Sequence, residues 1–101
     1  MMRMIPMLTM LLLTTASIVA SAADGKAIYD SVCYKCHRTG IDEAPKTGNK
    51  AEWAPRIAQG VDVLYKSVIE GKGAMDPRAG RPELSDEDLK AGVDYLVGLA
   101  K

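Results

Sequence analysis

Apolar residues recur at helical spacing in several segments of this chain. The most regular segment is residues 61–70, where one helix face would carry five apolar side chains: Val61, Leu64, Tyr65, Val68 and Ile69. The pattern predicts a helix that ends at Gly71 and turns this stripe toward the interior.

A second stripe predicts a helix over residues 86–100, close to the C-terminus. Its members are Leu89, Val93, Leu96, Val97 and Ala100. Ser85 is a candidate N-cap, and Asp88 three residues later forms a variant of the capping box. Gly92 and Tyr95 accompany the stripe, so this helix has a small residue at which another helix could cross it closely.

A shorter helix is predicted over residues 25–33, with Asp24 as a candidate N-cap. Gly25 and Tyr29 are four residues apart and therefore share one face. This small and aromatic pair predicts the point at which the first helix meets the last one.

A further helix is predicted over residues 50–59, with Gly60 as its stop. Pro55 is unusual there, because a proline inside a helix clashes with the carbonyl four residues earlier. We expect either a helix that begins near Ala51, with the proline in its first turn, or a kink. The segments 38–48 and 71–83 are rich in glycine and proline and are predicted to be loops.

The N-terminal residues 1–22 have the organisation of a secretory signal peptide. Arg3 is followed by a mostly apolar stretch, and Ala20-Ser21-Ala22 is a small-x-small cleavage pattern. The stretch is short for a membrane span, which needs about 20 apolar residues. We expect a mature domain of residues 23–101 in the periplasm with no integral membrane segment, and the alternative is an uncleaved N-terminal anchor.

Loss of residues 1–22 changes the composition. Five of the six methionines lie in that segment, so residues 23–101 keep one methionine, Met75, and one histidine, His37. Twelve basic and 13 acidic side chains remain, for a formal charge of −1. The absence of phenylalanine leaves little apolar material for a core, and domains of this size bury only about 60% of their unfolded surface. We expect the chain to need a bound group for stability.

The chemistry is concentrated in Cys33-Tyr34-Lys35-Cys36-His37, because the pattern C-x-x-C-H is the attachment site of a c-type haem. Two thiols at this spacing can each bond one vinyl group of a porphyrin, and the adjacent imidazole can reach the iron. A redox dithiol, a zinc site and a plain disulfide are the alternatives. A dithiol of the thioredoxin type needs a β-α-β framework that is not seen here, and structural zinc needs four ligands.

Other residues are candidates for the surroundings of that haem. If the iron has a sulfur ligand opposite His37, that ligand can only be Met75, in a loop with no apolar stripe to explain it. Pro45 can hold a backbone carbonyl that accepts the second ring N–H of His37. Trp53 and Arg56 could donate to haem propionates, or could be an ordinary core tryptophan and a surface arginine.

Taken together these residues resemble a class I cytochrome c. Gly25 and Tyr29 in an N-terminal helix, the C-x-x-C-H motif, a single loop methionine and a terminal helix carry the resemblance across residues 23–101. The stretches 44–48, 53–58 and 73–75, with Ser85-Asp86-Glu87-Asp88, are similar to the cytochrome c5 family of bacterial periplasmic proteins. Members of that family commonly carry a second cysteine pair after the methionine, and residues 76–83 contain none.

The resemblance implies an all-α fold of about four short helices around one covalently bound haem c, with crossing terminal helices. It also implies Cys33 and Cys36 as attachment residues, His37 and Met75 as axial iron ligands, and Pro45 as the carbonyl that orients His37.

With both axial positions filled by protein, electron transfer is favoured over catalysis. The expected function is a carrier of single electrons between protein redox partners, with no nucleic acid involved. The alternatives are an obligate haem subunit of a periplasmic oxidoreductase and a gas-binding or sensor haem. A basic excess near the haem, including Lys35 and Lys72, would favour an acidic partner, and a scatter of solvated charges is the other interpretation.

Overall fold

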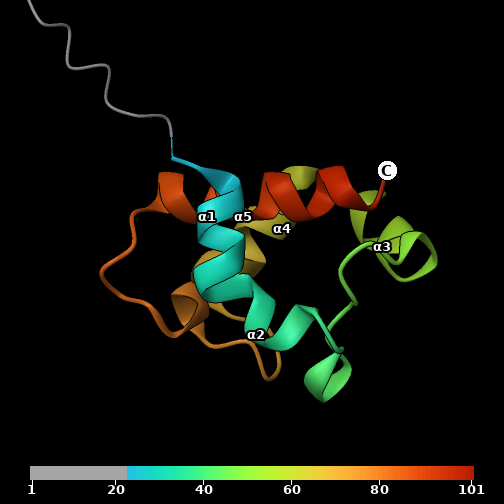
Figure 1. Cartoon of the computed structure of the whole chain (residues 1–101), viewed down its shortest axis with the longest axis horizontal. Coiled ribbons are helices and arrows are strands. Elements are labelled where there is room, and N and C mark those ends of the chain that lie inside the picture. The colour runs from blue at the N-terminus through green and yellow to red at the C-terminus, as the bar shows by residue number, and fades with distance from the viewer. Residues whose placement is uncertain (1–22) are drawn as a thin grey trace, which may run out of the picture.

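The computed structural model describes residues 23–101, so the signal segment predicted at residues 1–22 lies outside the described residues. The described residues are helical with no β-strand, which confirms the expected fold class. Four helical segments, seen in Figure 1, are joined by loops with short 3₁₀ turns. Their bounds are α1 Gly25–Ile28, continued by a π turn Tyr29–Cys33 and by α2 Tyr34–His37; α3 Lys50–Ile57; α4 Val61–Glu70; and α5 Asp86–Leu99. No helix in residues 23–101 is long and apolar enough to cross a membrane.

The first helix is longer than the sequence pattern indicates. Asp24 caps it through Oδ1, which accepts from the backbone N–H groups of Lys26 and Ala27. The backbone stays in the right-handed helical region through the π turn and α2, so the helix ends at His37 rather than at Cys33. A π turn inside a helix is frequent at functional sites. Here it lies directly before the cysteine and histidine motif.

The first and last helices cross closely, as predicted (Figure 1). A Cβ atom added to Gly25 would lie 2.4 Å from the carbonyl oxygen of Ala91, and one added to Gly92 would lie 2.8 Å from Ile28 Cγ2. The rings of Tyr29 and Tyr95 lie 5.4 Å apart beside this crossing. Two glycines on opposing helices therefore allow a backbone approach that larger residues would prevent.

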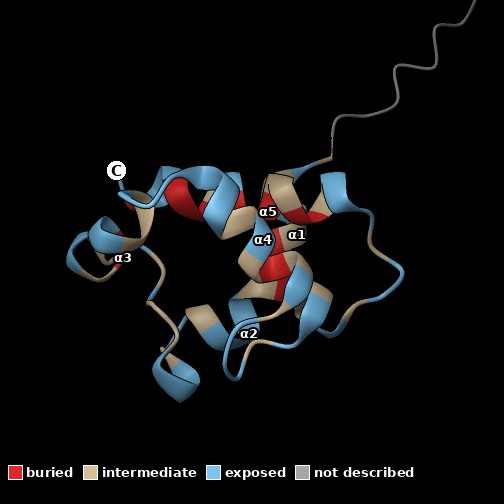
Figure 2. Cartoon of the chain, turned by 180° about the vertical axis from the view of Figure 1, so that it is seen from behind, coloured by how far each residue is buried: buried red, intermediate tan, exposed pale blue. Residues whose placement is uncertain are grey.

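Helix α5 carries the core of the domain. Ser85 and Asp88 form the predicted capping box, and the stripe is buried in full: Leu89, Val93, Leu96, Val97 and Ala100. Figure 2 shows the buried residues gathered where α1, α4 and α5 meet.

Helix α4 has the predicted bounds and buries Val68, but Val61 at its first position is 40% exposed. The part of the stripe that is shielded from solvent therefore begins at Leu64.

Helix α3 begins at Lys50, directly after Asn49, whose side chain accepts the backbone N–H of Glu52. Pro55 then lies in the second turn and not in the first. Because proline has no N–H, the carbonyl of Ala51 lacks its helical donor. The helix ends at Ile57, two residues before the predicted bound, and the chain turns at Gly60 with φ of 99°.

Candidate functional site

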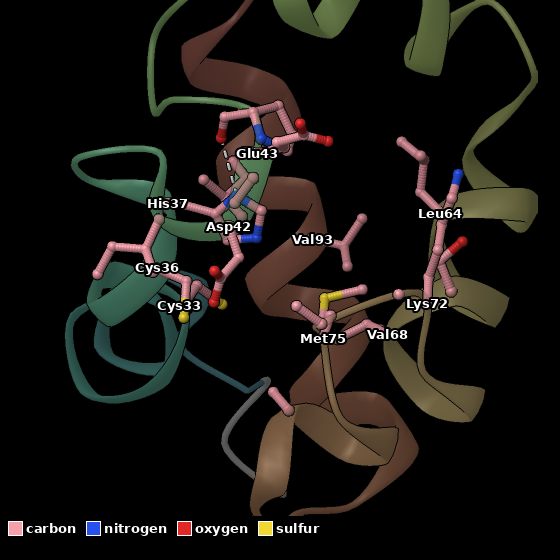
Figure 3. A pocket seen from close by; sticks show the side chains of 18 of the residues that line it. Cys33, Cys36, His37, Asp42, Glu43, Leu64, Val68, Lys72, Met75 and Val93 are labelled. Atoms are coloured by element: carbon pink, nitrogen blue, oxygen red, sulfur yellow. Dashed lines mark hydrogen bonds between the residues drawn. The ribbon is translucent and has the colours of Figure 1, made fainter.

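A cavity of about 370 Å³ lies between the first helix, α4, α5 and the two long loops. All seven residues predicted for the site line it: Cys33, Cys36, His37, Pro45, Trp53, Arg56 and Met75. In Figure 3 the cysteines and His37 lie on one side and Met75 and Val68 on the other, with Val93 of α5 between them. The fold thus brings together residues that are up to 42 positions apart in the sequence, from Cys33 to Met75.

The two thiols occupy the last turns of the first helix. Both are free, with Cys33 half-buried and Cys36 exposed. Burial raises the pKa of the Cys33 thiol to about 11. Neither thiol belongs, within residues 23–101, to a group of three or more side chains that could hold a metal ion. The zinc alternative therefore gains no support from the neighbours of these cysteines.

His37 is oriented by the loop that follows it. Its Nδ1 lies 2.8 Å from the carbonyl oxygen of Pro45, which is the hydrogen bond expected from the sequence. A carbonyl can only accept, so Nδ1 carries the proton and Nε2 is left with a free lone pair. Burial lowers the pKa of His37, with the bond to Pro45 acting in the opposite direction. The ring is therefore held in the neutral form that binds metals.

The loop at 45–47 is itself held at several points. The backbone N–H of Thr47 donates to the carbonyl of His37 at 2.8 Å. The Thr47 hydroxyl lies 2.8 Å from the hydroxyl of Tyr29, a buried residue of the helix crossing. These contacts tie the carbonyl of Pro45 to the packed part of the molecule, so the orientation of His37 is set by the fold and not by a free loop.

Trp53 is a buried core residue whose indole N–H has a backbone acceptor. It is 5% exposed, its indole N–H donates to the carbonyl of Lys46 at 2.8 Å, and its ring lies 5.6 Å from that of His37. This backbone acceptor was not indicated by the sequence, and Trp53 also lines the cavity. Arg56 lines the cavity and donates from Nη1 to the carbonyl of Glu52 at 2.6 Å.

Met75 is positioned by a tight reverse turn. The backbone groups of Lys72 and Met75 bond to each other in both directions, at 2.9 and 3.0 Å, around the tip Gly73-Ala74. A Cβ atom on Gly71, where φ is 87°, would lie 3.0 Å from the carbonyl oxygen of Met75. The side chain of Met75 packs against the core cluster of Val68, Leu89, Val93 and Val97. The turn thus directs the thioether toward the cavity.

The rim of the cavity carries charges of both signs. Asp42, Glu43 and Asp76 line it together with Arg56 and Lys72. Two further basic residues, in the loop that carries Met75, are paired: Arg78 with Asp86 at 2.7 Å, and Arg81 with Glu83. The lining side chains therefore do not show the basic excess that the sequence indicated.

Sequence reasoning missed the polar residues that hold the histidine loop, chiefly Glu52, whose carboxylate accepts the backbone N–H of Lys46 at 2.7 Å. A readable signal existed, because Asn49 and Glu52 have the spacing of an N-cap and its third helical residue. The signal predicts a helix start and does not reveal which loop atom the carboxylate reaches.

The residues around the cavity fit a covalently attached haem. Two free thiols can attach a c-type haem covalently, and an imidazole and a thioether can serve as ligands of its iron. The remaining walls are largely apolar, with Val32, Leu64, Val68, Val93 and Leu96. An apolar cavity with a few convergent polar groups is typical of cofactor sites.

Comparison with known proteins supports the same assignment. Residues 20–96 match the protein-family model described as "Cytochrome C oxidase, cbb3-type, subunit III". The chain is 44% identical over 95 residues to cytochrome c-555 of Chlorobaculum tepidum, covering 90% of this chain and 88% of that protein. It is 35% identical over 80 residues to cytochrome c5 of Azotobacter vinelandii, covering 77% and 96%.

Solved structures show the same fold. A chain in the crystal structure of an electron transfer complex of nitrite reductase with cytochrome c aligns with a TM-score of 0.74 and 44% identity, covering 77% of this chain and 95% of that chain. A mono-haem ferrocytochrome c from Shewanella putrefaciens aligns with a TM-score of 0.65 and 45% identity, covering 72% and 90%. The chain therefore belongs to the class I c-type cytochromes, close to the cytochrome c5 family, and carries one covalently bound haem c.

Proposed function

We propose that this protein is a periplasmic carrier of single electrons, with its haem bonded to Cys33 and Cys36 and its iron ligated by His37 and Met75. The observation that carries the proposal is the arrangement of these four side chains around one cavity, with the cysteines and His37 facing Met75 across it (Figure 3). The related proteins are electron-carrier cytochromes, which supports a carrier and not an enzyme.

The chain's own residues set the conditions for the transfer. The haem, when bound, supplies iron that cycles between the ferric and ferrous states. The carbonyl of Pro45 accepts the Nδ1–H of His37. As an iron ligand, the Met75 thioether would favour the ferrous state and so raise the reduction potential. The apolar side chains of Val68, Val93 and Leu96 form part of the cavity wall and limit the access of water to the bound group. If His37 and Met75 both bind the iron, no position would be left for a substrate.

The electron donor and acceptor are protein redox partners. The cytochrome c that aligns over 77% of this chain was solved in an electron transfer complex with nitrite reductase. A soluble oxidoreductase of that kind is therefore the class of partner that we propose. It would exchange electrons through the haem edge at the rim, where Ile41 is 50% exposed.

We further propose that residues 1–22 direct export and are removed. The mass of the protein recovered from the periplasm tests this directly. The proposal predicts a chain that begins at Ala23 and carries one haem. A mass that includes residues 1–22, in a protein released only by detergent, would instead support the uncleaved anchor.

The sixth ligand is tested with Met75→Ala. The wild-type ferric protein should show the methionine-to-iron charge-transfer band, and its reduced form should not bind carbon monoxide. The variant should keep its covalent haem, lose that band, bind carbon monoxide and show a lower reduction potential. An unaltered ferric spectrum in the variant would contradict Met75 as ligand. Binding of carbon monoxide by the wild type at neutral pH would support the gas-binding alternative.

A second candidate function is an obligate haem subunit of a larger oxidoreductase. The matching family model describes an oxidase subunit, and apolar side chains with no part in the cavity are exposed on the outer faces of α4 and α5: Val61, Val63 and Leu99. Gel filtration of native periplasm, followed by haem absorbance, separates the two. A carrier elutes at the position of the purified single chain, and a subunit elutes with its larger complex.

A further inference from the structure

One peptide group connects His37 to an acidic side chain on α3. The carbonyl of Pro45 accepts from His37 Nδ1 at 2.8 Å, and the N–H of Lys46 donates to Glu52 Oε2 at 2.7 Å. This carbonyl and this N–H belong to the same peptide group, whose two polar ends point in opposite directions. The three groups therefore form a continuous chain of hydrogen bonds from the carboxylate to the imidazole.

The carboxylate of Glu52 does not bond the backbone N–H that a glutamate at this helix position usually accepts. A glutamate at the third position of a helix usually accepts the backbone N–H of the N-cap residue. Here that N–H, on Asn49, donates to the carbonyl of Lys46 at 3.0 Å. The same carbonyl accepts the indole N–H of Trp53. The turn at 46–49 thus occupies the usual donor and leaves the Glu52 carboxylate to the N–H of Lys46.

The consequence for His37 follows from polarisation along the chain. A carboxylate that accepts from a peptide N–H makes the carbonyl at the other end a stronger acceptor, because linked hydrogen bonds strengthen one another. A stronger acceptor on Nδ1 raises the basicity of Nε2, as outer hydrogen bonds do for metal-bound histidines. A more basic ligand favours ferric over ferrous iron.

We propose that Glu52 is a positioning residue for the axial histidine, acting through the Pro45–Lys46 peptide to hold the ring and to lower the reduction potential. The inference rests on the proposed function, because it requires that His37 ligate the iron. Glu52 is half-exposed and does not line the cavity, so its effect on the reduction potential would be indirect.

Glu52→Gln tests the charge, because the amide oxygen can still accept from Lys46 while the negative charge is gone. The haem-loaded wild type and variant are compared at low ionic strength, where a half-exposed charge is least screened. We expect the ratio of ferrous to ferric protein at a fixed ambient potential to rise about threefold, a size reasonable for one charge acting through a medium of intermediate dielectric. We also expect the ¹⁵N resonance of His37 Nδ1 to move in the reduced protein.

Glu43→Gln is the matched control. Glu43 lines the cavity and makes no side-chain hydrogen bond or ion pair within the described residues, so the variant removes the same charge without touching the peptide. It can change the ferrous to ferric ratio through space, but it should leave the Nδ1 resonance of His37 in place. Glu52→Ala, which removes the acceptor as well, should move that resonance at least as far as Glu52→Gln does.

Three results would overturn the inference: an Nδ1 resonance that is unmoved in Glu52→Gln, an equal movement in Glu43→Gln, or no movement in Glu52→Ala. Circular dichroism of each variant verifies that the helices are intact. Failure of the proposed function is recognised separately. In that case the wild-type His37 resonances lack the large ring-current shift of an axial ligand, whatever the variants do.

Discussion

At the scale of single residues, two ring nitrogens close to the cavity have backbone partners. Trp53 donates to Lys46, and His37 is bonded to Pro45. Among the described residues no buried side-chain nitrogen or oxygen lacks a hydrogen-bond partner. Because an unpaired polar group in a low-dielectric interior is costly, this pairing explains why a small domain can place polar side chains against its cofactor site.

Tyr65, which does not line the cavity, allows a pH test at this scale. Its hydroxyl donates to Asp94, and this bond raises the pKa of Tyr65 to about 12 from the ordinary 10.0. A raised pKa means that the folded state holds the proton more tightly. The stabilisation is therefore complete below about pH 10 and is lost as the pH rises through about 12.

Tyr65→Phe should therefore reduce the free energy of unfolding by about 0.5–1 kcal/mol at neutral pH, since a hydrogen bond at a partly exposed site contributes little. Between pH 10 and 12 the difference from wild type should shrink toward zero. Denaturant unfolding of both proteins at pH 7 and at several values between pH 10 and 12 measures this difference in the free energy of unfolding. A difference that stays constant across this range would mean that the bond to Asp94 is not the origin of the stabilisation.

At the scale of elements, glycines decide how closely segments approach. Gly92 in α5 faces Ile28 and Cys33, whereas Gly98 in the same helix has no neighbour within 4 Å of an added Cβ. Gly71 and Gly73 in the methionine loop differ in the same way. Both pairs offer a test in which one substitution meets packed atoms and the other meets open space.

Gly92→Ala should destabilise the haem-loaded protein by about 1–3 kcal/mol, because the new methyl group would lie 2.8 Å from Ile28 Cγ2. Gly98→Ala should be neutral or stabilising by up to about 1 kcal/mol, the helix-propensity gain of alanine over glycine. Thermal unfolding of both variants compares them. Equal effects would show that the terminal helices are not held together through Gly92.

Gly71→Ala should weaken the position of Met75, because alanine is strained at φ of 87° and its Cβ would press on the Met75 carbonyl at 3.0 Å. We expect the methionine-to-iron band of the ferric protein to diminish. Gly73→Ala, with φ of 58° and open space around it, should cost about 1 kcal/mol of backbone strain and keep the band. Absorption spectra of the two ferric variants are compared. An intact band in Gly71→Ala would show that the contact between Gly71 and the Met75 carbonyl does not position Met75.

At the scale of the whole molecule, the domain has a small core arranged around its cofactor cavity. Nine apolar residues are buried in residues 23–101, and only Leu89 falls to about 2% exposure among the large ones. Eight of them form two clusters, one with Tyr29, Trp53, Leu96 and Ala100 and one with Val68, Leu89, Val93 and Val97, and members of both clusters line the cavity. A covalently attached apolar ring between those clusters would join them into one core.

The double variant Cys33→Ala with Cys36→Ala, which cannot attach haem, should therefore be largely unfolded. We expect most of the helical circular dichroism to be lost and thermal unfolding to lose its cooperativity, because the ligand that stabilises the native state is absent. The haem-loaded wild type is the control. A cooperative transition with native helix content in the double variant would show that the chain folds without its cofactor.

Local signals in the sequence were sufficient for much of this protein. The C-x-x-C-H motif, the solitary Met75 and the bounds of α4 depend on residues close together in the chain, and so does the capping box of α5. Such features can be predicted because neighbouring residues determine them. The crossing of the terminal helices was predictable for a related reason, since small residues on two apolar faces leave few other ways to pack.

Only the tertiary structure decided the features that depend on distant neighbours. It continued the first helix to His37, placed Pro55 in a second turn and left Val61 exposed at the start of α4. It also gave the indole of Trp53 a backbone acceptor and brought Glu52 to the peptide that bonds His37. Burial and hydrogen-bond partners arise from contacts between segments, and the pattern of one segment does not contain the position of another.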